Sequence, residues 1–331
     1  MYVDEPQSHL LPDIPGALDP HIKLSPMALH DAITGASTDY HYFTAPLSAV
    51  VPSLARRSEE MNGMAELRQS SGASGPLSVW VGGRGCCTQA HYDTEDNIFM
   101  QIHGTKKFTF YGPDTPKIHP YPDAHPRARK SQINFQAEGA PTNHGLTPAW
   151  EVTLVPGDAV SIPAFWWHHV EALSDSVSLN LFSPSPLWTQ AEEILSSQTP
   201  WSPETPPEAS MICLYSFISH LLPRIGFPIA AVFIEDMLAS RFDLLQPSQG
   251  PVLDQASSES LQAAVVADMA ANGEIYHGLG SILVERFERF EEQEGGKLAK
   301  MLVLAHLIEL WVVRIAGPKS AATVLRCFTQ V

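Results

Sequence analysis

The stretch that decides the fold is residues 88–111, with the sequence TQAHYDTEDNIFMQIHGTKKFTFY. Residues two apart on an extended strand point to the same side, so His91 and Asp93 can present an imidazole and a carboxylate to one point. The residues after Asp93 predict two strands joined by a tight turn at Gly104, with Asn97 just past the His-x-Asp pair. This pattern is typical of an antiparallel β-fold that carries a metal site.

A second histidine pair lies far downstream, in the sequence IPAFWWHHVEA of residues 162–172. Alternation along a strand gives His168 the apolar face, while His169 shares the other face with Glu171. Because the apolar face of a barrel strand is its interior, we predict that His168 completes the upstream pair. Two histidines and one carboxylate form the facial set that holds Fe(II) and leaves three positions open for cosubstrate and O2.

A lysine lies on the apolar face of the strand that follows Gly104. Lys106 shares that face with Phe108 and Phe110, whereas Lys107 lies on the opposite face. An ammonium group on an apolar face is costly unless it has an anionic partner. The pattern therefore indicates that Lys106 binds an anion, and a dicarboxylate cosubstrate would supply one.

Further strands are expected downstream. Residues 151–163, EVTLVPGDAVSIP, predict a strand, a Pro-Gly-Asp turn and a second strand. Residues 176–182, SVSLNLF, predict another strand, which ends at the SPSP sequence of residues 183–186. We expect a mainly β fold, a jelly-roll barrel, followed by an α-helical C-terminal region.

Residues from about 77 to 184 resemble the JmjC-type cupin oxygenases, in the small hydroxylase branch that contains an asparaginyl hydroxylase and a tRNA wybutosine hydroxylase. The resemblance rests on the stretches TQAHYD (88–93), QIHGTK (101–106), PGD (156–158) and IPAFWWHHV (162–170), with Asn97 and Asn180. It implies a double-stranded β-helix, Fe(II), 2-oxoglutarate and O2. It assigns His91, Asp93 and His168 to the metal, Lys106 and Thr88 to the distal carboxylate of 2-oxoglutarate, and Asn97 and Asn180 to its metal-chelating end.

The resemblance also implies a tyrosine from an early strand at the same distal carboxylate. The sequence DYHYFT of residues 39–44 resembles that strand, and we favour Tyr42 over Tyr40. Two tyrosines on a half-buried strand without a ligand role are an equal alternative. Members of the family carry a longer section before this strand, so we expect a barrel that is shortened on that side, or a trimmed variant, with an altered substrate rim.

Composition limits the partners. The chain has 331 residues, 44% of them hydrophobic, and 36 acidic against 20 basic residues give a formal net charge of −16. No lysine or arginine occurs between Lys130 and Arg224. Such a charge repels phosphate backbones and favours neutral or cationic partners, so we predict no nucleic-acid substrate.

Cysteine usage and hydropathy limit the cellular compartments in which the protein is expected. Four cysteines without a Cys-x-x-Cys motif predict neither a disulfide scaffold nor structural zinc. Residues 1–20 lack the apolar core of a secretory signal. The longest apolar run, residues 301–313, is interrupted by His306 and Glu309 and is too short to span a bilayer. We expect no membrane contact and a cytoplasmic or nuclear location.

The chain divides by composition into three parts. We predict a catalytic barrel with a short irregular N-terminal segment (1–186), a Pro-rich linker (187–207) and a helical region (208–331). The expected helices are residues 211–222, 229–245, 257–269, 279–292, 297–313 and 319–328. Residues 297–313 are apolar nearly all round, so they must be buried within the region or against a second subunit. Related hydroxylases dimerise through C-terminal helices, and we therefore expect a homodimer.

One long insert, residues 112–147, interrupts the predicted barrel. By the family resemblance it is expected over the barrel mouth as a substrate-contacting loop. Its histidines, His119, His125 and His144, are given no metal role, because lone loop histidines are usually solvated.

The function that these features favour is an Fe(II)- and 2-oxoglutarate-dependent oxygenase that hydroxylates a C–H bond of a protein or peptide side chain. Small-molecule (natural-product) oxidation is a close alternative. N-methyl-lysine demethylation would use the same chemistry, although no reader or zinc module favours it. Hydroxylation of tRNA conflicts with the charge, and a non-catalytic cupin conflicts with the complete His91, Asp93, His168 and Lys106 set.

Overall fold

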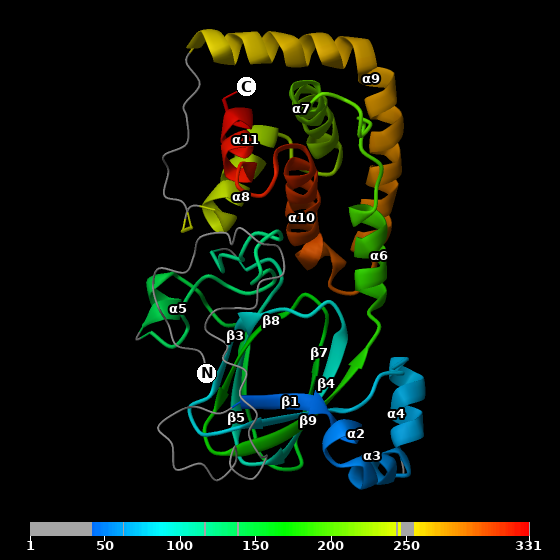
Figure 1. Cartoon of the computed structure of the whole chain (residues 1–331), viewed down its shortest axis with the longest axis vertical. Coiled ribbons are helices and arrows are strands. Elements are labelled where there is room, and N and C mark those ends of the chain that lie inside the picture. Colours follow the sequence, from blue (N-terminus) through cyan, green and yellow to red (C-terminus); the bar gives the residue numbers. More distant parts are fainter. Residues whose placement is uncertain are drawn as a thin grey trace. The chain divides into compact units, whose positions relative to one another are not determined.

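The structure, a computed structural model, describes residues 42–61, 63–115, 117–137, 139–242, 244–245 and 255–330. Tyr40 and residues 1–20 lie outside this part of the chain. The described residues fall into two compact units. Residues 42–115 and 129–189 form the barrel unit, and residues 117–128 and 190–330 form the helical unit. Figure 1 labels most of their strands and helices.

The barrel unit consists of two antiparallel sheets. The five-stranded sheet has the order β1-β2-β9-β4-β7, and the four-stranded sheet has the order β3-β8-β5-β6. Every pair of neighbouring strands is antiparallel. The strands are β1 (Tyr42–Pro46), β2 (Ser78–Gly82), β3 (Cys87–His91), β4 (Asp96–His103), β5 (Lys106–Tyr111), β6 (Trp150–Leu154), β7 (Ala159–Ile162), β8 (Trp167–Ala172) and β9 (Ser176–Ser183). This architecture confirms the predicted jelly-roll fold.

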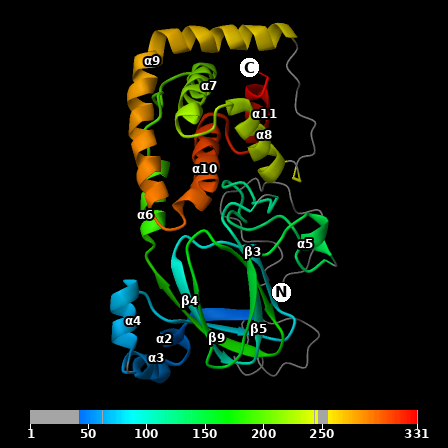
Figure 2. The same ribbon diagram turned by 180° about the vertical axis from the view of Figure 1, so that it is seen from behind.

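Alternation along the strands separates two apolar layers. On β4, Asn97, Phe99 and Gln101 are buried between the sheets, while Ile98 and Met100 face outward. The inner layer contains Phe99, Phe108, Phe110, Leu154, Ile162 and Val170. The outer layer lies between the five-stranded sheet and three short helices, α2 (Leu47–Val50), α3 (Pro52–Glu59) and α4 (Met64–Ser71). Figure 2 shows these helices beside β9. Because short helices cover the outer layer, the inner layer between the two sheets is where a functional site can lie.

The turn between β4 and β5 depends on Gly104, as the sequence predicts. Its φ is +69°, and a Cβ at this position would lie 1.9 Å from the Asp175 carbonyl oxygen. Any side chain would therefore displace the neighbouring backbone. The turn sets the register of β5, and so it fixes which face carries Lys106.

Part of the insert between β5 and β6 lies beside the barrel wall. Ser131 donates its N–H to the Ala90 carbonyl, which continues the four-stranded sheet beyond β3. Phe135 stacks on His169 and contacts Tyr111, both on the outer face of that sheet. The expectation that the insert covers the barrel mouth is therefore wrong for residues 131–137. The insert also contains the short helix α5 (Ala140–Asn143).

The first helix after the barrel begins one residue before the predicted Pro-rich linker and occupies residues 187–195 of it. Helix α6 starts at Pro186, where the missing N–H of proline is tolerated, and the Ser185 hydroxyl accepts the Trp188 N–H at 3.4 Å. Prolines occur both in linkers and at the first positions of helices, so the prolines before and at the start of α6 led to the prediction of a linker. The helices are α6 (Pro186–Leu195), α7 (Pro207–Arg224), α8 (Ala230–Arg241), α9 (Gln255–Glu292), α10 (Gly296–Ala316) and α11 (Ala321–Phe328).

Helix α9 corrects the prediction of two separate helices at 257–269 and 279–292. It is one helix of 38 residues, and Figures 1 and 2 show that it changes direction along its length. The glycines between the predicted helices weaken a helix without ending it, because no proline accompanies them. Gly280 lies where Arg224 of α7 packs, and a Cβ there would lie 2.6 Å from its guanidinium. Close helix packing explains this glycine.

Helix α10 is buried within the helical unit, with Leu304, Leu307, Ile308, Trp311 and Val312 almost fully covered. Burial of this apolar helix therefore needs no second subunit. No helix of the described chain is long and apolar enough to cross a membrane. All four cysteines are free thiols.

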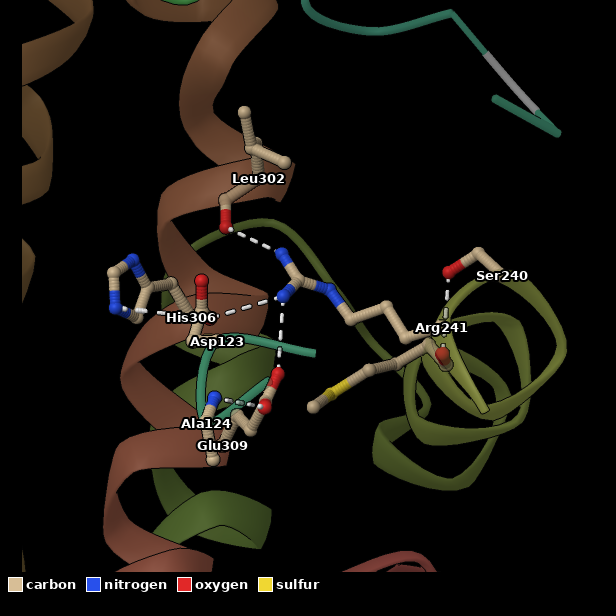
Figure 3. A network of polar contacts seen from close by, with 8 residues as sticks. Asp123, Ala124, Ser240, Arg241, Leu302, His306 and Glu309 are labelled. Carbon is tan, nitrogen blue, oxygen red and sulfur yellow. Dashed lines mark hydrogen bonds and ion pairs between the residues drawn. The ribbon is translucent and has the colours of Figure 1, made fainter. Parts of the chain in front are cut away.

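A buried charge network joins α8 and α10 to residues 117–128 (Figure 3). Arg241 donates to the carboxylates of Asp123 and Glu309, each at 3.0 Å. Its second terminal nitrogen lies 3.4 Å from the Leu302 carbonyl. His306 lies 3.6 Å from Asp123. Two carboxylates and a carbonyl thus surround one guanidinium, and the network anchors this part of the insert in the helical unit.

Candidate metal centre

Four side chains lie in one row across the inner face of the four-stranded sheet. His91 of β3 is opposite His168 of β8, which is opposite Phe110 of β5, which is opposite Trp150 of β6. Directly opposed residues of antiparallel strands project to the same side. Strand pairing therefore brings together two histidines that are far apart in the sequence.

The two imidazoles have fixed tautomers. His91 Nδ1 lies 2.8 Å from the Gln89 carbonyl oxygen, and His168 Nδ1 lies 3.0 Å from the Trp166 carbonyl oxygen. A carbonyl can only accept, so each Nδ1 carries the proton. Each Nε2 then presents a lone pair, which is the form in which histidine binds a metal ion.

Asp93 reaches the same place from beyond the end of a strand. The sequence suggested that His91 and Asp93 share one strand, but β3 ends at His91. Two backbone hydrogen bonds hold the residues that follow: Arg129 accepts the Tyr92 N–H at 3.1 Å, and Phe165 donates its N–H to the Asp93 carbonyl at 2.9 Å. Arg129 and Phe165 both have positive φ, 68° and 66°. Such strain gathers at functional sites, because the surrounding structure must impose it.

The three predicted ligands form a compact set of donors. One donor atom of each residue lies within 4.8 Å of the other two, and His91, Asp93 and His168 are the one such group in the described part of the chain. His168 Nε2 lies 3.8 Å from Asp93 Oδ2. Burial, and then the neighbouring His168, lower the pKa of His91 to about 3. Two imidazoles beside a carboxylate fit a divalent ion such as Fe(II).

His169 lies on the outer face of the same strand. It pairs with Thr109 of β5 and stacks on Phe135 with ring centroids 5.2 Å apart. Burial lowers its pKa to about 4. The neutral ring packs as an aromatic side chain, and it points away from His91.

Lys106 lies deeper on the inner face, two rows from the histidines. Phe108 separates Lys106 from Phe110 along β5, so the lysine backbone lies about 13 Å from the histidine row at 3.3 Å per residue. Lys106 is 4% exposed, and its ammonium nitrogen lies 5.2 Å from the centre of the Phe99 ring. Burial lowers its pKa to about 8. No carboxylate of the described residues pairs with it, whereas Lys107 on the outer face pairs with Glu151 at 2.9 Å.

Two hydroxyls occupy the row between Lys106 and the histidines. Thr88 lies opposite Val170, which is opposite Phe108. The Tyr42 hydroxyl lies 3.2 Å from the Thr88 hydroxyl oxygen. Both groups can donate to an anion that spans the distance from Lys106 to the metal ligands.

Two buried amides project from the facing sheet. Asn97 and Asn180 are each 3% exposed. The Asn97 side-chain oxygen has no hydrogen-bond partner among the described residues, while the Asn180 oxygen accepts the Trp80 indole N–H. An unsatisfied buried amide oxygen is rare, and it is a position where a bound ligand or water would donate.

The sequence did not reveal three neighbours of this centre. Lys130 pairs with His91 through an isolated antiparallel bridge, and Arg129 lies within 3.4 Å of the Thr94 hydroxyl. Trp150 stacks on Phe110 at 3.9 Å. The basic pair was visible in the sequence, but nothing local indicated that it continues the histidine row.

Comparisons with known proteins agree with this geometry. Residues 28–185 match the family of cupin-like domains. Jumonji C domain-containing protein 5 of Drosophila melanogaster is 28% identical over 110 residues, which cover 32% of this chain and 27% of that protein. The lysine-specific demethylase JMJ31 of Arabidopsis thaliana is 25% identical over 126 residues, 37% of this chain and 23% of that protein.

The name of a third relative refers to tRNA, whereas that of the Arabidopsis relative refers to lysine. The tRNA wybutosine-synthesizing protein 4 of Aspergillus oryzae is 32% identical over 111 residues, which cover 33% of this chain and 10% of that protein. The chain thus aligns with between 10% and 27% of the length of these three relatives. The similarity therefore concerns only a part of each relative.

Proposed function

The chain contains a cupin-like domain of the type found in Jumonji C proteins, and from this premise we propose that it is an Fe(II)- and 2-oxoglutarate-dependent oxygenase. Its reaction would be hydroxylation of a C–H bond in a protein or peptide side chain. The observation that carries the proposal is the donor set of His91, Asp93 and His168, with both Nε2 atoms free to coordinate. The alternative of a non-catalytic cupin would not require this set.

The proposal that 2-oxoglutarate is the cosubstrate rests on Lys106 and on the hydroxyls of Thr88 and Tyr42, which lie between Lys106 and the histidines. A buried ammonium without a carboxylate partner is unfavourable, and the distal carboxylate of 2-oxoglutarate would neutralise it. Thr88 and Tyr42 would donate hydroxyl hydrogen bonds to the same carboxylate. The orphaned oxygen of Asn97, with Asn180 beside it on the facing sheet, would contact the metal-chelating end.

When bound, iron with 2-oxoglutarate and O2 would supply the oxidising chemistry, with succinate and CO2 as by-products. The residues of the chain have positioning roles. The Gln89 and Trp166 carbonyls orient the two imidazoles, and Phe165 N–H holds the Asp93 backbone. Phe108 and Phe110 exclude water on the inner face.

The test is metal binding with a matched pair of variants. Wild-type protein is expected to bind one Mn(II) or Fe(II) per chain and to form succinate from 2-oxoglutarate. Asp93→Ala removes a ligand and is expected to weaken metal binding by orders of magnitude and to abolish succinate formation. Glu95→Ala removes an exposed carboxylate two residues away and should change neither. Full metal binding by Asp93→Ala would exclude this residue from the site.

The name of the Arabidopsis relative, a lysine-specific demethylase, supports a protein substrate. Three further proposals carry over from the sequence: a cytoplasmic or nuclear location, the division into a barrel (1–186), a linker and a helical region (208–331), and a homodimer formed through C-terminal helices. Sedimentation of the full chain tests the dimer, since a monomer at micromolar concentration would exclude it.

A further inference from the structure

The row that crosses the metal centre has two chemically different ends. Lys130 lies opposite His91 through an antiparallel bridge, so its side chain projects to the face that carries the His91 ring. At the other end, Trp150 stacks on Phe110 and is 40% exposed. One end of the row is therefore cationic, and the other is an accessible aromatic surface.

Arg129 adds a second positive charge at the cationic end. Its guanidinium lies 3.4 Å from the hydroxyl of Thr94, the residue after Asp93. Its backbone is held at φ 68°, in the region that disfavours every residue except glycine. The hydrogen bond from Tyr92 N–H to the Arg129 carbonyl maintains this conformation beside β3. The structure thus fixes an exposed arginine next to a predicted metal ligand.

The basic pair Arg129 and Lys130 belongs to a chain that is acidic as a whole. The formal net charge is −16, and the basic residues elsewhere on the barrel include two that are paired, Arg68 with Glu59 and Lys107 with Glu151. No carboxylate of the described residues lies within ion-pair distance of Arg129, whose recorded side-chain neighbour is a hydroxyl. A guanidinium in this situation can bind both oxygens of a carboxylate.

We propose that the substrate of this centre carries a carboxylate close to its reacting carbon, bound by Arg129 at the end of the row where Lys130 adds a second basic residue, and that Trp150 contacts an apolar part of the same substrate. The inference rests on the proposed oxygenase function and names its substrate class. That class is an acidic side chain in a peptide or a free carboxylic acid. It differs from the cationic partner that the net charge alone favours.

The test uses full-length protein loaded with Mn(II) and 2-oxoglutarate, because Mn(II) broadens the proton resonances of molecules bound near it. The probes are an eight-residue leucine- and alanine-rich peptide with a central aspartate, the same peptide with a central asparagine or lysine, and N-acetylaspartate. We expect the aspartate protons to be broadened most. Broadening of the peptide alone would identify a protein substrate, and broadening of N-acetylaspartate a free acid.

Charge reversal provides the controls. The double variant Arg129→Glu, Lys130→Glu should weaken binding of the acidic probe by about tenfold or more. Arg84→Glu reverses one charge at an exposed arginine before the opposite end of β3 and should leave binding unchanged. Added salt should weaken the wild-type interaction.

Three results would overturn the inference: equal or stronger broadening of the lysine peptide, no broadening of either carboxylate probe at millimolar concentration, or no effect of the double charge reversal. Preferential broadening of a ten-nucleotide RNA would also overturn it. Failure of Mn(II) to bind wild-type protein, seen in water-proton relaxation, would instead contradict the oxygenase function. The two failures are therefore distinguishable.

Discussion

Lys106 of the barrel unit and Arg241 of the helical unit are both buried cations, 4% and 2% exposed, in opposite surroundings. Arg241 lies between two carboxylates and a backbone carbonyl. Lys106 faces an aromatic ring, and no carboxylate of the described residues pairs with it. Arg241 is therefore neutralised within the protein, whereas Lys106 would gain its counter-charge from a ligand. A buried cation therefore indicates a binding site only where its counter-charge is missing.

The largest expected effect is that of Arg241→Met on stability. The carboxyl groups of Asp123 and Glu309 would remain buried without the guanidinium, and removing one partner of a buried ion pair typically costs about 3–5 kcal/mol of unfolding free energy. Urea denaturation followed by tryptophan fluorescence measures the loss. Arg289→Met, in the exposed pair with Glu193, is the control and should cost less than about 1 kcal/mol. Equal losses in the two variants would mean that the buried network is no more important than a surface pair.

Lys106→Met should lower the affinity for 2-oxoglutarate and leave metal binding unchanged. Losing a charge-assisted contact in a desolvated site costs about 2–5 kcal/mol, which is roughly a 30- to several-thousand-fold loss of 2-oxoglutarate affinity. The unliganded variant should be at least as stable as wild type, because it no longer buries an uncompensated charge. Anaerobic calorimetric titration of the Fe(II)-loaded protein measures the affinity.

The matched control for that variant is Lys107→Met on the outer face, which should bind 2-oxoglutarate as wild type does. Equal losses at positions 106 and 107, or none at 106, would show that the cosubstrate is held elsewhere.

The two regions should also respond to pH with opposite slopes. Burial lowers the pKa of Lys106 from 10.5 to about 8. Between these values the unfolded chain holds a proton that the folded chain has lost, so unfolding free energy should rise with pH, by at most about 1.4 kcal/mol per pH unit. Burial, and then Asp123, raise the pKa of Glu309 from 4.5 to about 8. The folded chain then holds the extra proton, so this contribution falls as pH rises from 4.5 to 8.

Denaturation across both pH ranges measures these slopes, with Lys106→Met removing the first and Glu309→Gln the second. A wild-type slope that survives both substitutions would have to come from other groups.

The smallest expected effect is that of Tyr42→Phe. Losing one hydroxyl that donates to a carboxylate should lower 2-oxoglutarate affinity by about 0.5–1.5 kcal/mol, or roughly two- to tenfold. Competition binding against a labelled 2-oxoglutarate analogue resolves such a change. Unchanged affinity would favour the alternative that Tyr42 and Thr88 form a structural hydrogen bond without a ligand role.

The sequence predicted the faces of the strands well, because side chains alternate with a period of two and one face is buried. This rule separated His168 from His169 and Lys106 from Lys107. It could not predict where β3 ends, since the position of Asp93 depends on backbone contacts with Arg129 and Phe165.

Contacts between residues far apart in the chain could not be predicted, because no local sequence pattern indicates them. The bridge from Lys130 to His91 and the network of Asp123, Arg241 and Glu309 join residues that only the fold brings together. The prediction of two helices in place of α9 failed for another reason. Gly273 and Gly278, which lie between the two predicted helices, resemble breaks in the sequence, yet isolated glycines weaken a helix without ending it.

The assignment of residues 117–128 to the helical unit determines how the protein could be divided. These residues lie between β5 and β6 in the chain, so a single cut near residue 189 would separate Asp123 from Arg241. One fragment would keep Asp123 without its arginine, and the other would keep Arg241 with Glu309 alone. We expect that neither fragment is fully native by itself. Co-expressed, they should complement each other as a split protein, and substitution of Asp123 should weaken that complementation.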